Sequence, residues 1–145
     1  MLYDALADPT GATPADLLDA YAAELADALA DDDPATVAET VGVDEATVET
    51  MAGGDPEAVA DVRLADAAAV LERVEGVPAH DIAHEVRDHL MMGMVTAILD
   101  VDTIAAEIDA DLTGQEVQQA LEGRTRLTLG ELADIQALVI ERTPE

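Results

Sequence analysis

The chain has 145 residues, half of them hydrophobic, and a formal net charge of -27 at pH 7. Its length suits one domain or two small packed halves, and the hydrophobic fraction argues against a disordered chain. It contains neither cysteine nor serine, which excludes disulfides, thiolate metal ligands, and cysteine or serine nucleophiles.

Helical periodicity dominates the sequence, and strand signals are almost absent. Apolar residues recur at spacings of three and four, and segments such as DPTGATP, DDDP, GGDP and EGVP separate the periodic stretches. The expected helices cover residues 14–31, 34–42, 44–53, 62–75, 79–99, 102–109, 113–123 and 128–142. This order predicts an all-α fold of two tandem four-helix repeats, each similar to a helix-turn-helix, packed as one compact unit.

Three stretches of the first half resemble three stretches of the second half in the same order. TVAETVGV from Thr36 aligns with TIAAEIDA from Thr103, TVETMAGG from Thr47 with EVQQALEG from Glu116, and LADAAAVLE from Leu64 with LADIQALVIE from Leu132. The offsets are 67, 69 and 68 residues. They predict repeats covering residues 1–76 and 77–145, joined near Gly76. The alternative is chance matching between Ala-rich helices.

In the first half, residues 34–53 resemble a helix-turn-helix of the phage-repressor type. Ala38 provides a small residue where two helices cross, and Gly42 suits a turn that needs positive φ. The surrounding apolar positions are Val37, Val41, Val43, Val48 and Met51. The second helix of this copy carries no basic residue, and its carboxylates are those of Asp44, Glu45, Glu49 and Asp55. Because carboxylates repel phosphates, we expect this copy to be structural only.

The second copy has a weaker packing pattern and more suitable chemistry for DNA. Ile104, Ala105 and Ile108 occupy the buried positions, Asp109 replaces the turn glycine, and two additional residues lengthen the turn. Gln and Arg can pair with bases and phosphates. The candidate DNA contacts are Thr113, Gln115, Gln118, Gln119, Arg124 and Arg126. The alternative is that these are ordinary solvent-facing residues or contacts for a protein.

The stretch HLMMGMVTAIL has apolar residues on nearly every side of the expected helix. This pattern predicts a helix that is buried all round, as the spine on which the repeats pack. The alternative places Met91, Met92 and Met94 against a protein partner or a second subunit, because flexible methionine side chains suit adaptable contacts.

The three histidines, His80, His84 and His89, lie on one expected helix. His80 and His84 could bind a metal together with a carboxylate, but no third ligand is recognisable, so we expect a polar surface without a metal. P-loop, GxGxxG and kinase signatures are also absent. We therefore expect no catalytic residue, no cofactor and no enzymatic activity.

Acidic residues number 33, whereas the six basic residues are all arginine. Such a charge repels itself in ordinary salt, but at molar salt the Debye length falls to about 3 Å. The pattern resembles proteins of halophilic archaea; an acidic adaptor from another source is the alternative. The acidic start and the shortness of the longest apolar run favour a cytoplasmic protein without membrane contact.

The blocks MLYDAL, RDHLMMGMVTAILDVD and QQALEGR, the last followed by TL, resemble a small haloarchaeal family of uncharacterised proteins. That resemblance implies no activity, cofactor or catalytic residue. The sequence predicts a small helix-turn-helix-like regulator that binds DNA through its second repeat. The alternative is a non-catalytic protein–protein interaction module.

Overall fold

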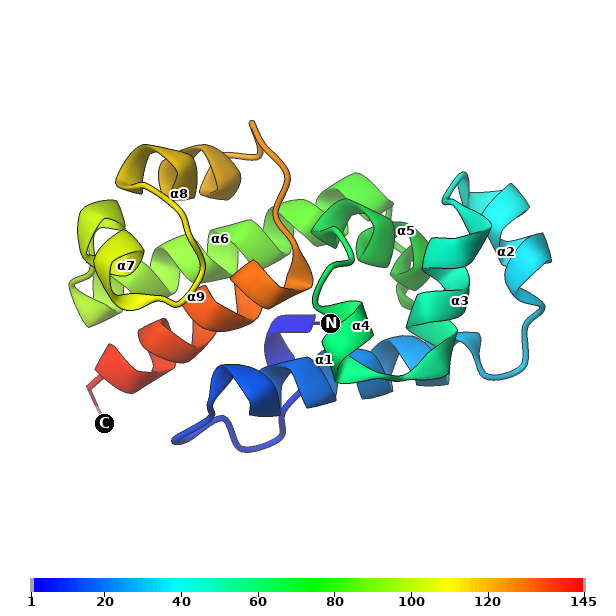
Figure 1. Ribbon diagram of the computed structural model, residues 1–145, viewed down its shortest axis with the longest axis horizontal. Helices are drawn as coiled ribbons and strands as arrows, with labels where there is room; N and C mark the ends of the chain where they lie inside the picture. The colour runs from blue at the N-terminus through cyan, green and yellow to red at the C-terminus, as the bar shows by residue number, and fades with distance from the viewer. Residues whose placement is uncertain (1, 145) are drawn as a thin grey trace.

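The computed structural model describes residues 2–144, and within them the chain forms nine α-helices and one short 3₁₀-helix (Figure 1). The first half contains η1 (Leu2–Asp4), α1 (Pro14–Leu29), α2 (Pro34–Val41), α3 (Glu45–Gly53), α4 (Pro56–Val59) and α5 (Leu64–Glu75). The second half contains α6 (Ala79–Ala97), α7 (Val101–Glu107), α8 (Gly114–Leu121) and α9 (Leu129–Arg142). The all-α prediction is confirmed; η1 and α4 are additional to the helices expected from the sequence.

Local chemistry explains where many of the helices begin and end. Thr13, Thr113 and Thr128 each form a capping box with an acidic residue three positions later, which satisfies backbone amides at the start of the helix. Three helices end at a glycine in the left-handed conformation: Gly42, Gly54 and Gly76. Helix α6 ends instead at Ile98, with φ 56°, a conformation that is strained for a β-branched residue.

The two halves lie along the long axis of the molecule, with α2 and α3 at one end and α7 and α8 at the other (Figure 1). Within each half, the first long helix contacts the last one, α1 with α5 and α6 with α9. Between the halves, α5 packs on α6 and α1 packs on α9. The first and last helices of both halves therefore share one core, and the short helices project from it at both ends.

The buried positions of these long helices recur with an offset of 65 residues. In α5 they are Leu64, Ala67, Ala68, Val70 and Leu71, and in α9 the first five are Leu129, Leu132, Ala133, Ile135 and Gln136. In α1 and α6 the matching buried pairs are Leu17 and Ile82, Tyr21 and Val86, and Leu25 and Leu90. Leu64 thus corresponds to Leu129, one helical turn before the Leu132 of the sequence alignment. The shared pattern supports a duplicated unit, although the duplication itself stays a prediction.

Two reciprocal backbone hydrogen bonds join the halves. The N–H of Leu64 donates to the carbonyl of Leu127 at 2.7 Å, and the N–H of Leu129 donates to the carbonyl of Val62 at 2.8 Å. The same offset of 65 relates the members of one bond to those of the other, as in an isologous interface. This pairing brings Arg63, just before α5, next to the segment that follows α8.

One polar side chain, that of Gln136, lies among the buried hydrophobic residues within residues 2–144. Its Oε1 accepts a hydrogen bond from the Tyr21 hydroxyl, and its Nε2 donates to the Tyr3 carbonyl at 3.0 Å. Burial raises the pKa of Tyr21, which keeps the hydroxyl protonated as a donor. These bonds satisfy the amide and connect α1, α9 and the N-terminal segment.

The methionine-rich end of α6 is not the fully buried spine predicted from the sequence. Leu90 is buried, and Met91 and Met94 are half-buried against the core. The exposed fractions on the other face are 64% for Met92, 79% for Val95 and 89% for Ile98. The prediction fails because α9 covers one face of α6 only. Among the described residues no single helix is long and apolar enough to cross a membrane; α6 and α7 meet that criterion only as a pair bent by 94°.

Candidate functional site: an arginine-lined pocket beside α8

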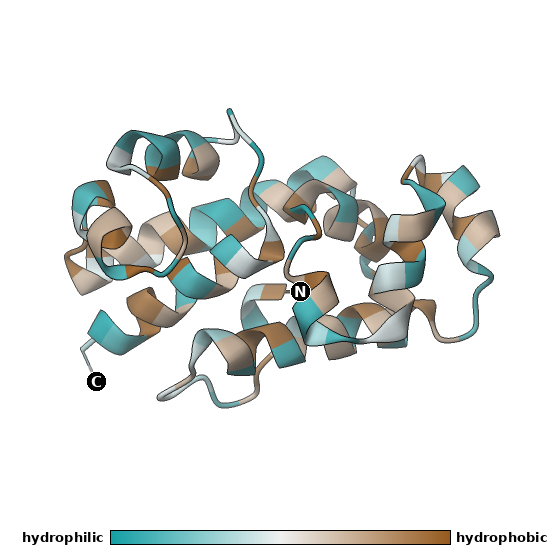
Figure 2. Ribbon diagram, in the orientation of Figure 1, coloured by the Kyte–Doolittle hydropathy of each residue, from teal (hydrophilic) through white to brown (hydrophobic). Residues whose placement is uncertain are grey.

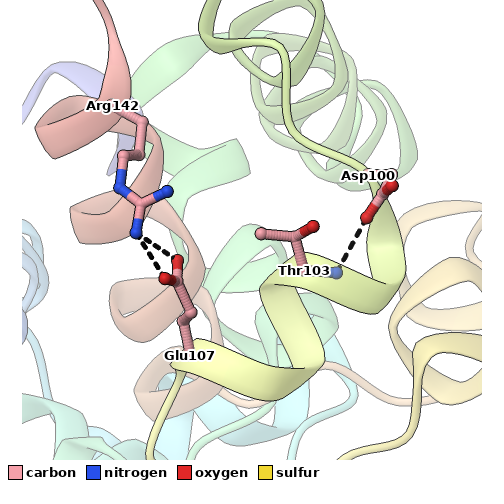
Figure 3. Close-up of polar contacts among 4 residues, drawn as sticks. All are labelled: Asp100, Thr103, Glu107 and Arg142. Carbon is pink, nitrogen blue, oxygen red and sulfur yellow. Dashed lines mark hydrogen bonds and ion pairs between the residues drawn. The ribbon is translucent and has the colours of Figure 1, made fainter.

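The α7–α8 unit corresponds to the predicted second helix-turn-helix, and α7 is fixed at both of its ends (Figure 3). At its start, the Asp100 side chain accepts a hydrogen bond from the Thr103 N–H at 2.8 Å. This bond is the main reason that the pKa of Asp100 is lowered. At its end, Glu107 forms an ion pair with Arg142 of α9. Helix α7 is therefore tied to α9 and provides a fixed support for α8.

The turn between α7 and α8 differs from the turn between α2 and α3. Gly42 ends α2 with φ 75°, as the sequence predicts. In the second copy, Ile108 follows α7 in an extended conformation, and no residue from 108 to 113 has positive φ. The expectation that Asp109 replaces Gly42 as the left-handed turn residue is therefore wrong. The longer turn crosses between the helices in extended form and needs no such residue.

Helix α8 buries the three residues expected to face inward, Val117, Ala120 and Leu121. Among the DNA-contact candidates, Gln115 and Gln118 are exposed, whereas Gln119 is half-buried. The Thr113 hydroxyl accepts the N-terminal hydrogen bond of α8 from the Glu116 amide. Figure 2 shows hydrophilic and hydrophobic residues alternating along α8, followed by a mostly hydrophilic segment leading toward α9.

A pocket of about 780 Å³ opens beside α8, between the starts of α5 and α6 and the α8–α9 segment. Its basic and amide lining residues are Arg63, His80, Arg87, Gln119, Arg124 and Arg126. Four of the six arginines of the chain thus meet in one pocket. The structure brings Gln119, Arg124 and Arg126 together as pocket residues, while Gln115 and Gln118 lie outside the pocket lining.

The arginines outside this pocket are paired with carboxylates, whereas those inside it are largely unpaired. Arg73 contacts Asp32 at 2.6 Å, and Arg142 contacts Glu107. In the pocket, Arg124 contacts its neighbour Glu122 at a longer 3.4 Å. Within residues 2–144, the other three pocket arginines have no carboxylate partner: Arg63, Arg87 and Arg126. This absence is informative in a chain with 33 carboxylates.

Arg87 forms part of the pocket wall and is half-buried. Its Nε donates to the Ala120 carbonyl at 2.9 Å, which leaves four of its five N–H groups without a protein acceptor among the described residues. Desolvation lowers its pKa, which shows that the cation is partly removed from water. Such a group is costly unless a further acceptor reaches it.

The backbone adds positive potential at the same pocket. Helix α5 begins here, and its N-cap residue Arg63 makes no side-chain capping bond, so Ala65 brings the positive end of the helix dipole to the lining. Glu116 is the one carboxylate among the lining residues. Its Oε1 already accepts a hydrogen bond from the Thr113 amide. The arrangement is therefore suited to binding an anion.

A second pocket, of about 830 Å³, lies between the N-terminal loop and the α7 and α9 helices and has the opposite character. Its charged lining residues are Glu107, Asp109, Asp134 and Glu141. Burial is the main cause of a raised pKa at Asp134, and the charges of Asp109 and Glu131 raise it further. This contrast shows that the basic lining of the α8 pocket is local rather than general.

The histidines do not form a metal site. Within the described residues, no group of three or more potential ligands could hold a metal ion. His80 lines the α8 pocket, His84 is exposed, and His89 stacks on Tyr3 with ring centroids 4.4 Å apart. The contribution of Arg63, Arg87 and His80 to the α8 pocket was not foreseen from the sequence, because no spacing links them to residues 124–126.

Comparisons with known proteins identify one family and no further relative. The model of a family of unknown function (DUF5791) matches residues 17–142. No curated protein and no solved structure matches the chain. The matched region runs from α1 to the end of α9 and includes every lining residue of the α8 pocket.

Proposed function

The chain belongs to the DUF5791 family, and we propose that it is a non-catalytic, DNA-binding regulator in the cytoplasm of a salt-accumulating cell. In this proposal, α8 enters the major groove, and the segment after α8 contacts the backbone. The main supporting observation is that Gln115 and Gln118 are exposed on α8 close in sequence to Arg124 and Arg126. Exposed amides can pair with adenine, and arginines can bind guanine or phosphate.

The opposite end of the molecule explains why only one unit is proposed to bind. Asp44, Glu45 and Glu49 of the α2–α3 unit are exposed, and α3 carries no basic residue. Because the two units lie at opposite ends of the long axis (Figure 1), α8 can approach a duplex while α3 stays distant from it. This separation reduces the repulsion that the acidic copy would otherwise exert on phosphates.

DNA binding is tested by selecting duplexes from a random library with the full chain in molar KCl. The selected duplex is then titrated by fluorescence anisotropy. Replacing Gln115→Glu together with Gln118→Glu should weaken binding about tenfold or more, because each good base contact contributes roughly 1–3 kcal/mol. Arg124→Glu together with Arg126→Glu should also weaken it and flatten its salt dependence.

The matched control is Glu45→Gln together with Glu49→Gln on α3, which should leave DNA affinity unchanged. The proposal is overturned if the wild-type chain selects no duplex, or if the glutamine pair can be replaced without loss of affinity. A loss of affinity with the α3 control variant would also contradict it, since it would place the contact on the other unit.

The exposed face of α6 supports a second candidate function, self-association. Met92, Val95 and Ile98 follow one another at three-residue spacing, with half-buried Met91 and Met94 beside them. No carboxylate occurs from residue 89 to residue 99. Two copies of so acidic a chain can meet here without bringing carboxylates together, so we propose a second copy as the partner.

Light scattering of the full chain in molar KCl tests this association. Val95→Asp should convert dimers to monomers. Val74→Asp is the matched control, because Val74 is also exposed, at 62%, but lies on α5 away from this face. A wild-type chain that stays monomeric up to millimolar concentration excludes the second candidate.

A further inference from the structure

We propose that the arginine-lined pocket beside α8 binds a small phosphate-bearing molecule of about nucleotide size. The site is distinct from the DNA-contact face, and the inference does not depend on DNA binding. It assigns roles to Arg63, Arg87 and His80, which the proposed regulator function does not use. The ligand is defined by its chemistry, a phosphate or diphosphate group on an organic body.

The charge of the lining is the first argument. Four arginines and a histidine face one pocket whose single lining carboxylate, Glu116, is already engaged in a capping box. Bringing like charges together is unfavourable unless an opposite charge joins them. The chain has 33 carboxylates available, yet Arg63, Arg87 and Arg126 have no carboxylate partner among the described residues. An external anion satisfies these cations.

The geometry around Arg87 is the second argument. Its Nε is fixed on the Ala120 carbonyl, which orients the guanidinium plane. Gly123 lies over that group: a Cβ at this position would be 3.7 Å from Nη1, 3.8 Å from Cζ and 3.9 Å from Nε of Arg87. Because Gly123 has no side chain, the guanidinium is left uncovered. A fixed guanidinium with free N–H groups is suited to the planar, bidentate recognition of phosphate oxygens.

The size and remaining lining indicate the class of ligand. A volume of about 780 Å³ lies within the roughly 300–1,000 Å³ of small-molecule pockets and leaves room beyond a phosphate group. Ala65, Ala83 and Leu112 provide apolar surface for an organic body. The start of α5, a helix of 12 residues without a side-chain cap, adds its positive end. Together these features favour a phosphorylated organic molecule over inorganic phosphate.

The test uses the full chain in 2 M KCl with three probes: ADP, inorganic phosphate and adenosine. Thermal unfolding and isothermal titration are measured for each probe. ADP should bind saturably and raise Tm as a ligand of the native state. Inorganic phosphate should bind more weakly, because it lacks the organic body, and adenosine should not bind measurably. Equal binding of adenosine and ADP, or no saturable binding of ADP up to 10 mM, overturns the proposal.

Arg63→Gln is the main variant, since Arg63 is exposed and its replacement leaves the core intact. It should weaken ADP binding about tenfold or more, given the strength of charge-assisted hydrogen bonds. Arg87→Gln should do the same, with circular dichroism confirming its helix content. Arg73→Gln, at an arginine paired with Asp32 outside the pocket, is the matched control and should bind ADP as the wild type does. Unchanged ADP affinity in Arg63→Gln contradicts the proposal.

Two variants separate this inference from the proposed DNA contact. Gln115→Glu with Gln118→Glu alters exposed residues outside the pocket lining, so it should lose DNA and keep ADP. Arg63→Gln should lose ADP and keep DNA. If ADP affinity falls only in the glutamine variant, the pocket assignment fails, whatever the result with DNA. If the selected duplex competes with ADP one for one and adenosine-free phosphate does not bind, the pocket is part of the DNA surface instead.

Discussion

The α2–α3 and α7–α8 units have corresponding contacts in their halves of the molecule but differ in turn, charge and connection. The first unit turns at Gly42 in the left-handed conformation, and its second helix exposes carboxylates. The second unit turns in extended form, and its second helix is followed by Arg124 and Arg126. Packing and surface chemistry therefore depend on different residues, and one can change while the other is kept.

The offset between equivalent buried residues locates these differences. It is 65 residues between α1 and α6, 67 from Val37 to Ile104, and 69 from Val48 to Val117. It returns to 65 between α5 and α9. The four residues gained before α8 are thus lost again before α9, in the region where the first half has the four-residue helix α4. The arginine-bearing segment occupies the place of α4.

The largest stability effect is expected at Gly93, where α6 crosses α9. A Cβ added there would lie 2.6 Å from Cγ1 of Val139, so Gly93→Ala requires a stiff β-branched side chain to move. We expect a loss of about 1–3 kcal/mol in the free energy of unfolding, measured by denaturant titration in 2 M KCl.

The equivalent residues of the first half, 65 positions earlier, provide the comparison for Gly93. They are Ala28, which is half-buried, and Val74, which is 62% exposed. Ala28 is accommodated because no buried valine opposes it at the corresponding position of α5. Adding Val139→Ala to Gly93→Ala should recover part of the loss by removing the clash. A fully stable Gly93→Ala chain would show that the two helix crossings are equally permissive.

The turns offer a smaller and more direct comparison. Gly42→Ala places a Cβ on a residue with φ 75°, and we expect a loss of about 1 kcal/mol. Asp109→Ala should leave stability nearly unchanged, because the α7–α8 turn has no residue of positive φ. Thermal unfolding of both variants in molar KCl measures the difference. An equal loss in both variants would mean that the two turns resist substitution for the same reason.

The sequence was sufficient to predict most of the fold because helix signals are local. Pro34 after the N-cap residue Asp33 and the Thr13 capping box are read within four residues. The exposed end of α6 was missed because an apolar helix resembles a buried one, whatever its neighbours cover. The pocket was missed for a related reason: Arg63 and Arg87 join Arg126 only through the packing of α5, α6 and α8.

The smallest expected effect concerns Asp134, whose equivalent in the first half, 65 residues earlier, is uncharged Ala69. Burial raises the pKa of Asp134, and the charges of Asp109 and Glu131 add to the shift, so ionisation costs more in the folded than in the unfolded chain. That cost is absent below the unfolded pKa of about 3.9 and develops as pH rises through the folded value. Asp134→Asn should therefore be more stable than the wild type at pH 7, by less than about 1 kcal/mol after solvent screening. Unfolding curves from pH 3 to pH 7 should show this advantage disappearing at the acidic end, whereas an advantage independent of pH would assign it to packing.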